Sequence, residues 1–171
     1  EKEDARANGI EPVEHTVAID ALAIIVHPDN PVSQLSLEQL SAIYTGKITN
    51  WSDVGGDEGL IVLLSRETNS GTNVYFLEEV VRQGDGDSEL IFAPQTILMP
   101  SSVGITSELR RNPNAIGYDG LGYVDPDHEK ILAIARTDDS AYVLPSVETA
   151  LSGDYPLARN LFMYTAGEPT G

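Results

Sequence analysis

Residues 66–72, which read Arg-Glu-Thr-Asn-Ser-Gly-Thr, are the segment of this chain best suited to bind a ligand. They follow a short apolar run and precede an amphipathic one, so they should connect a buried strand to a helix. The first N–H groups of a helix lack partners and attract anions. Arg66 adds a planar, permanently charged donor, and Gly71 leaves room for close approach. Ser70 and Thr72 add hydroxyl donors, so the segment predicts a phosphate or sulfate site, although Ser-Gly-Thr is also a common helix cap.

Patterns for catalysis or metal binding are weak elsewhere in the chain. It has no cysteine, which excludes a disulfide framework, a cysteine zinc site and a cysteine nucleophile. His15, His27 and His128 are not spaced like a helical metal pair. The acidic segment 125–129 lacks the spacing of a calcium loop, and we interpret it as a solvated turn. A lysine-containing phosphate loop and a GxSxG elbow are also missing. From these patterns together we predict no metal, no cofactor and no catalytic residue.

The composition describes an acidic globular chain of about one domain. It has 171 residues, with 27 Asp and Glu against 10 Lys and Arg, a formal net charge of −17. This excess excludes nucleic-acid binding through a basic surface and argues against docking on an anionic membrane. A surface poor in lysine suits salty or extracellular surroundings. No apolar run approaches the roughly 18–20 residues of a membrane span, and the acidic first residues do not resemble a signal peptide.

Strands and helices alternate around the 66–72 segment. We expect strands at 15–26, 60–64, 115–118, 130–136 and 161–164, and helices within 36–46, 70–84, 101–112 and 146–151. This alternation predicts an α/β fold, with a central mixed, mostly parallel sheet of about five strands and helices on both faces. The near-continuous apolar run 15–26 is typical of a strand buried on both sides.

Three local patterns refine the expected elements. Ser36-Leu-Glu-Gln39 forms a capping box that begins the first of these helices. Trp51 is interpreted as a loop residue anchored in the core. The helix after Thr72 should bury an apolar stripe, formed by Val74, Leu77, Val80 and Val81.

Five ordered segments resemble the phosphate-binding proteins of Pst-type ABC transporters, within the periplasmic-binding-protein-like superfamily. They read HTVAIDALAIIVHPDNPV, LSLEQLSAIYTGKITNWSDVGG, SRETNSGTNVYF, NPNAIGYDGLGYV and YPLARNLFMYT, they occur in the family's order, and the resemblance covers nearly all of residues 5–165. The resemblance implies a receptor that clamps a dehydrated phosphate between two lobes, and one lobe of a type II binding-protein fold for this chain. The arginine and Ser-Gly-Thr of the family's RxxxSGT segment bind the anion, and these roles fall on Arg66, Ser70, Gly71 and Thr72.

The resemblance also implies that residues 1–171 are the second lobe alone, a single domain with a loose tail at 166–171. The first lobe, which holds the other side of the phosphate, is expected to be missing, and Asp20-Ala21-Leu22 stands where the family commonly has Asp-Gly. The implied function is phosphate reception for an importer, without catalysis, in the periplasm or at the cell surface. The implied partners are phosphate, the missing lobe and the transporter's membrane subunits.

Two other functions stay open on the sequence. The lobe could be a structural or interaction module of an extracellular or surface assembly, which would self-associate; the half-site and the acidity favour this reading. An enzyme that hydrolyses phosphate esters has the least support, because no general base is placed near Ser70.

Overall fold

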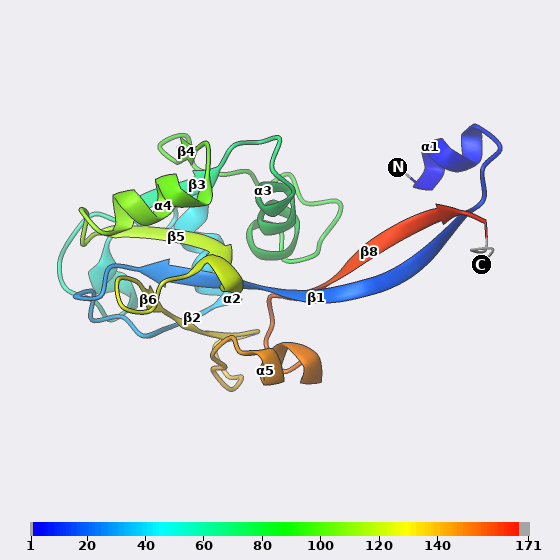
Figure 1. Ribbon diagram of the computed structural model, residues 1–171. Helices are drawn as coiled ribbons and strands as arrows, with labels where there is room; N and C mark the ends of the chain where they lie inside the picture. The colour runs from blue at the N-terminus through cyan, green and yellow to red at the C-terminus, as the bar shows by residue number, and fades with distance from the viewer. Residues whose placement is uncertain (1, 168–171) are drawn as a thin grey trace.

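A computed structural model describes residues 2–167 as a body with one long arm (Figure 1). The body contains a sheet in the order β4-β3-β5-β1-β6, and β8 pairs with β1 beyond it. Strands β3, β4 and β5 are parallel, whereas β1 is antiparallel to β5, β6 and β8, so five of these six strands share one direction. The predicted mixed, mostly parallel sheet is confirmed. Its strands are β1 (Pro12–Val26), β3 (Val62–Arg66), β4 (Ile97–Met99), β5 (Ala115–Gly120), β6 (Lys130–Ile131) and β8 (Ala158–Ala166).

Short helices and a second, two-stranded sheet complete the described part of the chain. The small parallel sheet pairs β2 (Gln34–Ser36) with β7 (Ala133–Ala135). Across residues 2–167, none of the helices combines the length and apolar character that crossing a membrane requires. The helices are α1 (Lys2–Ala7), α2 (Leu37–Tyr44), α3 (Gly71–Phe76), α4 (Ser102–Leu109) and α5 (Val147–Ser152), with the 3-10 turns η1 (Trp51–Val54) and η3 (Leu121–Tyr123) and the π-helical turn η2 (Leu77–Val81).

The prediction of one strand over 130–136 is wrong, because the chain changes sheets within it. The Leu132 amide donates to the Ile24 carbonyl of β1, whereas the Ala133 amide donates to the Ser33 carbonyl beside β2. The apolar run is therefore divided between β6 in the main sheet and β7 in the small one. Periodicity reports burial along a run, and it does not report a change of partner strand.

Helices cover both faces of the main sheet, as predicted. Along β1, Leu22 and Ile24 belong to a core that includes residues of α2, α3 and η2, while Ala23 and Ile25 belong to a second core that includes residues of α4. This alternation explains why the sequence of β1 is apolar at consecutive positions. A Cβ atom at Gly117 of β5 would lie 2.7 Å from the Ile105 side chain, so only glycine lets α4 approach this closely.

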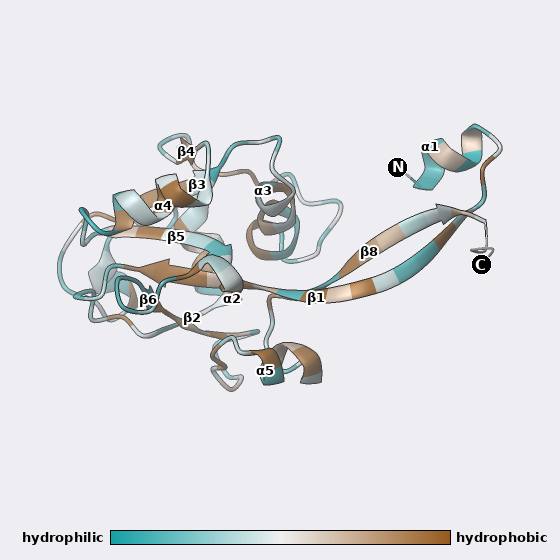
Figure 2. Ribbon diagram, viewed as in Figure 1, coloured by the Kyte–Doolittle hydropathy of each residue, from teal (hydrophilic) through white to brown (hydrophobic). Residues whose placement is uncertain are grey.

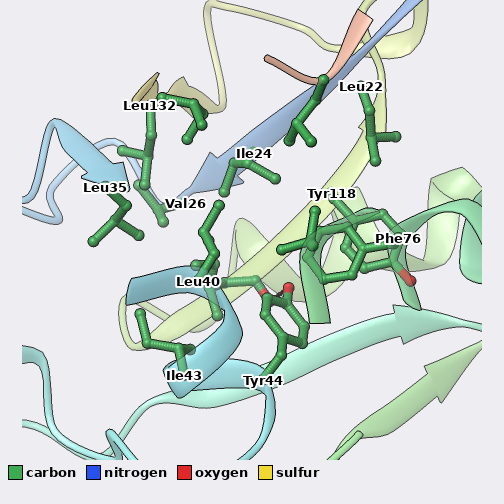
Figure 3. Packing of buried hydrophobic residues seen from close by; sticks show 14 of the residues in the cluster. Leu22, Ile24, Val26, Leu35, Leu40, Ile43, Tyr44, Phe76, Tyr118 and Leu132 are labelled. Carbon is green, nitrogen blue, oxygen red and sulfur yellow. Dashed lines mark hydrogen bonds between the residues drawn. The ribbon is translucent and has the colours of Figure 1, made fainter. Parts of the chain in front are cut away.

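Three aromatic rings form the centre of the larger core (Figure 3). Phe76 of α3 stacks on Tyr118 of β5 with ring centroids 3.8 Å apart, and Tyr44 of α2 meets Phe76 edge-on at 4.6 Å. The Tyr118 hydroxyl hydrogen-bonds the Ser65 hydroxyl at 2.6 Å, and the Tyr44 hydroxyl donates to the Leu64 carbonyl at 3.2 Å. Both phenol hydroxyl groups therefore form hydrogen bonds with residues of β3, the strand that ends at the 66–72 segment.

The apolar stripe predicted for the helix after Thr72 is wrong in register at its start. Val74 is 43% exposed, whereas Phe76, Val80 and Val81 are buried. The Asn73 side chain is drawn inward by hydrogen bonds to β3, so Phe76, three residues later, takes the inward position. The π-helical turn η2 then adds a residue to the turn and brings Val80 and Val81 onto the same face.

The arm is a ribbon in which β8 runs back along the first part of β1. Pairing extends from Pro12 opposite Ala166 to Ala21 opposite Ala158. The chain continues past the tip into α1, which folds back beside the ribbon so that Lys2 contacts Glu14 (Figure 1). Figure 2 shows the brown of hydrophobic residues along β8 and on parts of β1 outside the body. The predicted tail at 166–171 starts at the last residue of β8, and 168–171 lie outside the described residues. Six apolar side chains of the ribbon are at least 40% exposed, namely Val17, Ile19, Leu161, Phe162, Met163 and Tyr164.

The buried phenol of Tyr118 should make stability depend on alkaline pH. Burial raises the pKa of Tyr118 to about 12, whereas an unfolded tyrosine titrates near 10. The contribution of the neutral Tyr118 phenol to the free energy of unfolding is therefore complete below pH 10 and is lost as the pH rises through about 12. Roughly 1 kcal/mol of this contribution should be lost between pH 9 and pH 11. Urea unfolding should show the stability difference between the wild type and Tyr118→Phe shrinking by that amount. A difference that stays constant with pH would contradict this assignment.

Candidate anion site

The 66–72 segment lies where predicted, between the carboxyl end of β3 and the start of α3. Arg66 is the last residue of β3, and Ser70 is the N-cap of α3, with its hydroxyl accepting from the Thr72 amide at 3.3 Å. Because η2 continues α3 without a break, the helical turns run from Gly71 to Val81. The edge beyond the carboxyl ends of parallel strands is where open α/β sheets bind ligands.

Asn73 fastens this loop to the core. Its side-chain amide donates to the Arg66 carbonyl at 2.9 Å and to the Ser65 hydroxyl at 3.0 Å, and Ser65 in turn bonds Tyr118. Asn73 is only 3% exposed, so these bonds form away from competing water. Sequence reasoning missed this residue. The signal available was its spacing, since a polar residue three before Phe76 and seven before Val80 falls on the buried face.

The Arg66 side chain reaches across to α4. Its Nη1 donates to the Ser102 hydroxyl at 3.3 Å, and its Nη2 to the Pro100 carbonyl at 3.4 Å. The Ser102 hydroxyl donates to Oδ1 of Asp119 on β5 at 2.9 Å. Ser102 and Asp119, which sequence reasoning also missed, therefore belong to the surroundings of the site.

The four predicted site residues lie between the last residue of β3 and the first turn of α3, and the Arg66 side chain is directed toward α4. Gly71 is exposed, and no atom lies within 4 Å of where its Cβ would be, so the start of α3 is open to a ligand. Ser70 and Thr72 are half-buried beside it, and Asn73 closes the loop back onto the Arg66 carbonyl. Chemically, the loop offers hydroxyl donors, helix-terminal N–H groups and one guanidinium. These groups suit a tetrahedral oxyanion.

Other residues weighed from the sequence lie away from this loop. Trp51 is 2% exposed and its indole N–H donates to the Asn114 carbonyl at 3.0 Å, which confirms its role as an anchor. The prediction of a solvated 125–129 turn is wrong at Glu129, which is 2% exposed. Asp125 contacts His128 at 2.8 Å, and this hydrogen bond holds the pKa of Asp125 below its usual range. Within residues 2–167, no cluster of three or more His, Asp or Glu side chains has metal-binding geometry.

Comparison with known families identifies the chain. The family described as PBP superfamily domain matches residues 1–171. The chain belongs to this family. Membership agrees with the resemblance seen in the sequence.

Curated relatives of this PBP superfamily domain are named phosphate-binding proteins. The protein named Phosphate-binding protein PstS from Pseudomonas aeruginosa is 35% identical over 173 aligned residues, which cover 94% of this chain and 51% of the relative. The protein of the same name from Bacillus subtilis is 33% identical, over 100% of this chain and 52% of the relative. The chain therefore spans about half the length of the curated relatives it matches.

Solved structures agree with the fold. An ABC-type phosphate transport receptor from Vibrio cholerae superposes with a TM-score of 0.78 at 29% identity, covering 93% of this chain and 62% of the receptor. A substrate-binding protein assigned to a phosphate ABC transporter of Clostridium perfringens, with bound phosphate, also gives 0.78, at 34% identity over 98% of this chain and 63% of that protein. The predicted α/β binding-protein architecture of this PBP superfamily domain is confirmed.

Proposed function

We propose that this PBP superfamily domain binds inorganic phosphate at Arg66 and the 70–72 segment, as half of the solute receptor of an ABC importer. The observation that supports this most is the loop itself, with Arg66 at the end of β3 and the exposed Gly71 at the start of α3. The names of the relatives point to the same anion. The proposed role is binding and delivery, with no chemical step.

The donor groups of this loop, and not the net charge of the chain, should decide whether an anion binds there. The formal net charge is −17, which on its own would repel an anion. A charge-assisted hydrogen bond from a guanidinium contributes roughly 1.5–3 kcal/mol. Salt largely screens the repulsion between the anion and exposed carboxylates that lie more than about 10 Å from it. One half of a clamp leaves the anion hydrated on its far side, so we expect a dissociation constant of about 1 mM or weaker for this chain alone.

A complete receptor needs a second half over the phosphate. The relatives have about as much chain again outside the matched region. The exposed apolar side chains of the ribbon offer a surface on which such a lobe would pack. With that lobe, we propose that the receptor works in the periplasm or at the cell surface and delivers phosphate to the membrane subunits of the importer.

The ribbon also supports the alternative function, an interaction module that self-associates. Phe162 and Met163 are 44% and 53% exposed, and apolar surface of this kind favours contact with a second copy. Sedimentation velocity of the chain distinguishes the two. Reversible dimers that Phe162→Ser disrupts would favour the module, whereas a monomer at all concentrations would reject it.

Filling the space above Gly71 should block phosphate without unfolding the chain. A Cβ atom there meets no side chain or distant backbone and Gly71 is exposed, so we expect Gly71→Leu to change the free energy of unfolding by no more than about 0.5 kcal/mol. The leucine side chain would stand in the approach to the helix start, and we expect at least about ten-fold weaker binding, a loss of roughly 1.4 kcal/mol. An NMR titration with phosphate measures this. Gly86→Leu is the matched control, at another open glycine, and equal binding by both variants would reject the site.

A further inference from the structure

One serine hydroxyl links Arg66 to a buried carboxylate. Arg66 Nη1 donates to the Ser102 hydroxyl at 3.3 Å, and that hydroxyl donates to Oδ1 of Asp119 at 2.9 Å. The three side chains come from three elements, β3, α4 and β5, and the residues are 36 and 17 positions apart along the chain. Figure 1 shows these elements side by side at this end of the body.

The Asp119 carboxylate sets the orientation of the Ser102 hydroxyl. Asp119 is 4% exposed, and its Oδ1 also accepts the Gly120 amide at 2.9 Å, so the side chain has a fixed position. Because the Ser102 hydroxyl donates to Oδ1, its proton points toward Asp119. The lone pairs of the Ser102 oxygen are then left to face the guanidinium.

Little else within the described residues holds the guanidinium of Arg66. Asn73 fixes the backbone carbonyl of Arg66 and not its side chain. The Pro100 carbonyl accepts from Nη2 at 3.4 Å, and Nε is buried without a hydrogen-bond partner in the described part of the chain. A long side chain with several free torsions loses entropy when a ligand has to order it, so a partner that orders it beforehand raises affinity.

We infer that Ser102 and Asp119 are positioning residues of the anion site, which hold the Arg66 guanidinium in the orientation that receives the anion. This inference rests on the proposed phosphate binding at Arg66. Neither residue needs to touch the anion. Asp119 orients the Ser102 hydroxyl, and Ser102 orients Arg66.

The test uses Ser102→Ala in the 171-residue chain, with Ser107→Ala as a control on an exposed position of the same helix. Two quantities are measured by NMR, the affinity for inorganic phosphate and the resonance of the Arg66 Nε–H group without phosphate. We expect Ser102→Ala to weaken phosphate binding about 3- to 10-fold, as loss of one hydrogen bond does. It should also shift the Arg66 resonance and speed its exchange with water, while Ser102→Thr, which keeps the hydroxyl, restores both.

A second variant separates positioning from a merely structural role. Asp119→Asn keeps an acceptor for Ser102 but removes the charge that sets the direction of the hydroxyl, and it should move the Arg66 resonance in the same way. Wild-type affinity and an unchanged Arg66 resonance in Ser102→Ala would overturn the inference. If instead the wild type binds no phosphate while Ser102→Ala still moves the Arg66 resonance, the proposed function fails and the link between these side chains stands.

Discussion

Arg66→Ala is expected to weaken phosphate binding by this chain roughly 10- to 100-fold. Hydrogen bonds to a charged group contribute about 1.5–3 kcal/mol each, and Arg66 is the residue of the 66–72 loop with a permanent positive charge. Arg66 ends β3 four residues before Ser70, the N-cap of α3, and its guanidinium contacts Ser102 and Pro100. The loss is measured by titrating phosphate into both proteins at one ionic strength, because surface electrostatics depend on salt.

Two controls make the Arg66 result specific. Arg111→Ala removes the same charge from an exposed position outside the 66–72 loop and should leave binding within about two-fold, since exposed distant charges are screened. Arg66→Lys keeps the charge but loses the planar fork, and should fall between the wild type and Arg66→Ala. If Arg111→Ala weakened binding as much as Arg66→Ala, the chain would attract phosphate through its overall charge and not through this loop.

Phe76→Ala is expected to lower the free energy of unfolding by about 3–5 kcal/mol, the usual cost of truncating a buried aromatic side chain. Phe76 is fully buried between Tyr44 and Tyr118, with its ring 3.8 Å from that of Tyr118. The cavity would also loosen Asn73 and Ser65, which hold the 66–72 loop. Urea denaturation measures the change.

Val74→Ala is the matched comparison for Phe76, since both residues belong to α3. Val74 is 43% exposed, and we expect its truncation to cost less than about 1 kcal/mol. The apolar stripe predicted from the sequence places Val74 in the core instead. A larger loss of stability in Val74→Ala than in Phe76→Ala would favour that stripe and contradict the register of the structure.

The sequence predicts those parts of the fold whose causes are local. Ser36 and Gln39 make both hydrogen bonds of the capping box, and Gly46 ends the helix region with a φ of +77°. Residues 21–26 of the apolar run form the buried part of β1, because a strand covered on both faces needs apolar residues at consecutive positions. The prediction of burial on both faces is wrong for residues 15–20, which pair with β8 in the ribbon and lie outside the core. The order of strand, loop and helix around residues 66–72 follows from the same kind of signal.

What the sequence does not predict depends on contacts between distant segments. Ser102 and Asp119 reach Arg66 only because α4 and β5 pack beside β3, and nothing in their local spacing indicates it. The inward position of Asn73 needs acceptors on β3, so it shifts the buried face of α3 by tertiary contacts. Glu129 is buried although its neighbours along the chain are polar, and Arg110, the residue after α4, lies 4.0 Å from its carboxylate.

The most direct test of phosphate binding is an NMR titration of the 171-residue chain with inorganic phosphate, using chloride at equal ionic strength as the reference. Saturable shifts should appear at the backbone amides of Gly71 and Thr72 and at the Arg66 Nε–H group, and they should be absent with chloride. In Arg66→Ala the two amide shifts should saturate only at much higher phosphate. Shifts that do not saturate, or that appear elsewhere and leave residues 66–72 unmoved, would contradict a phosphate site at the start of α3.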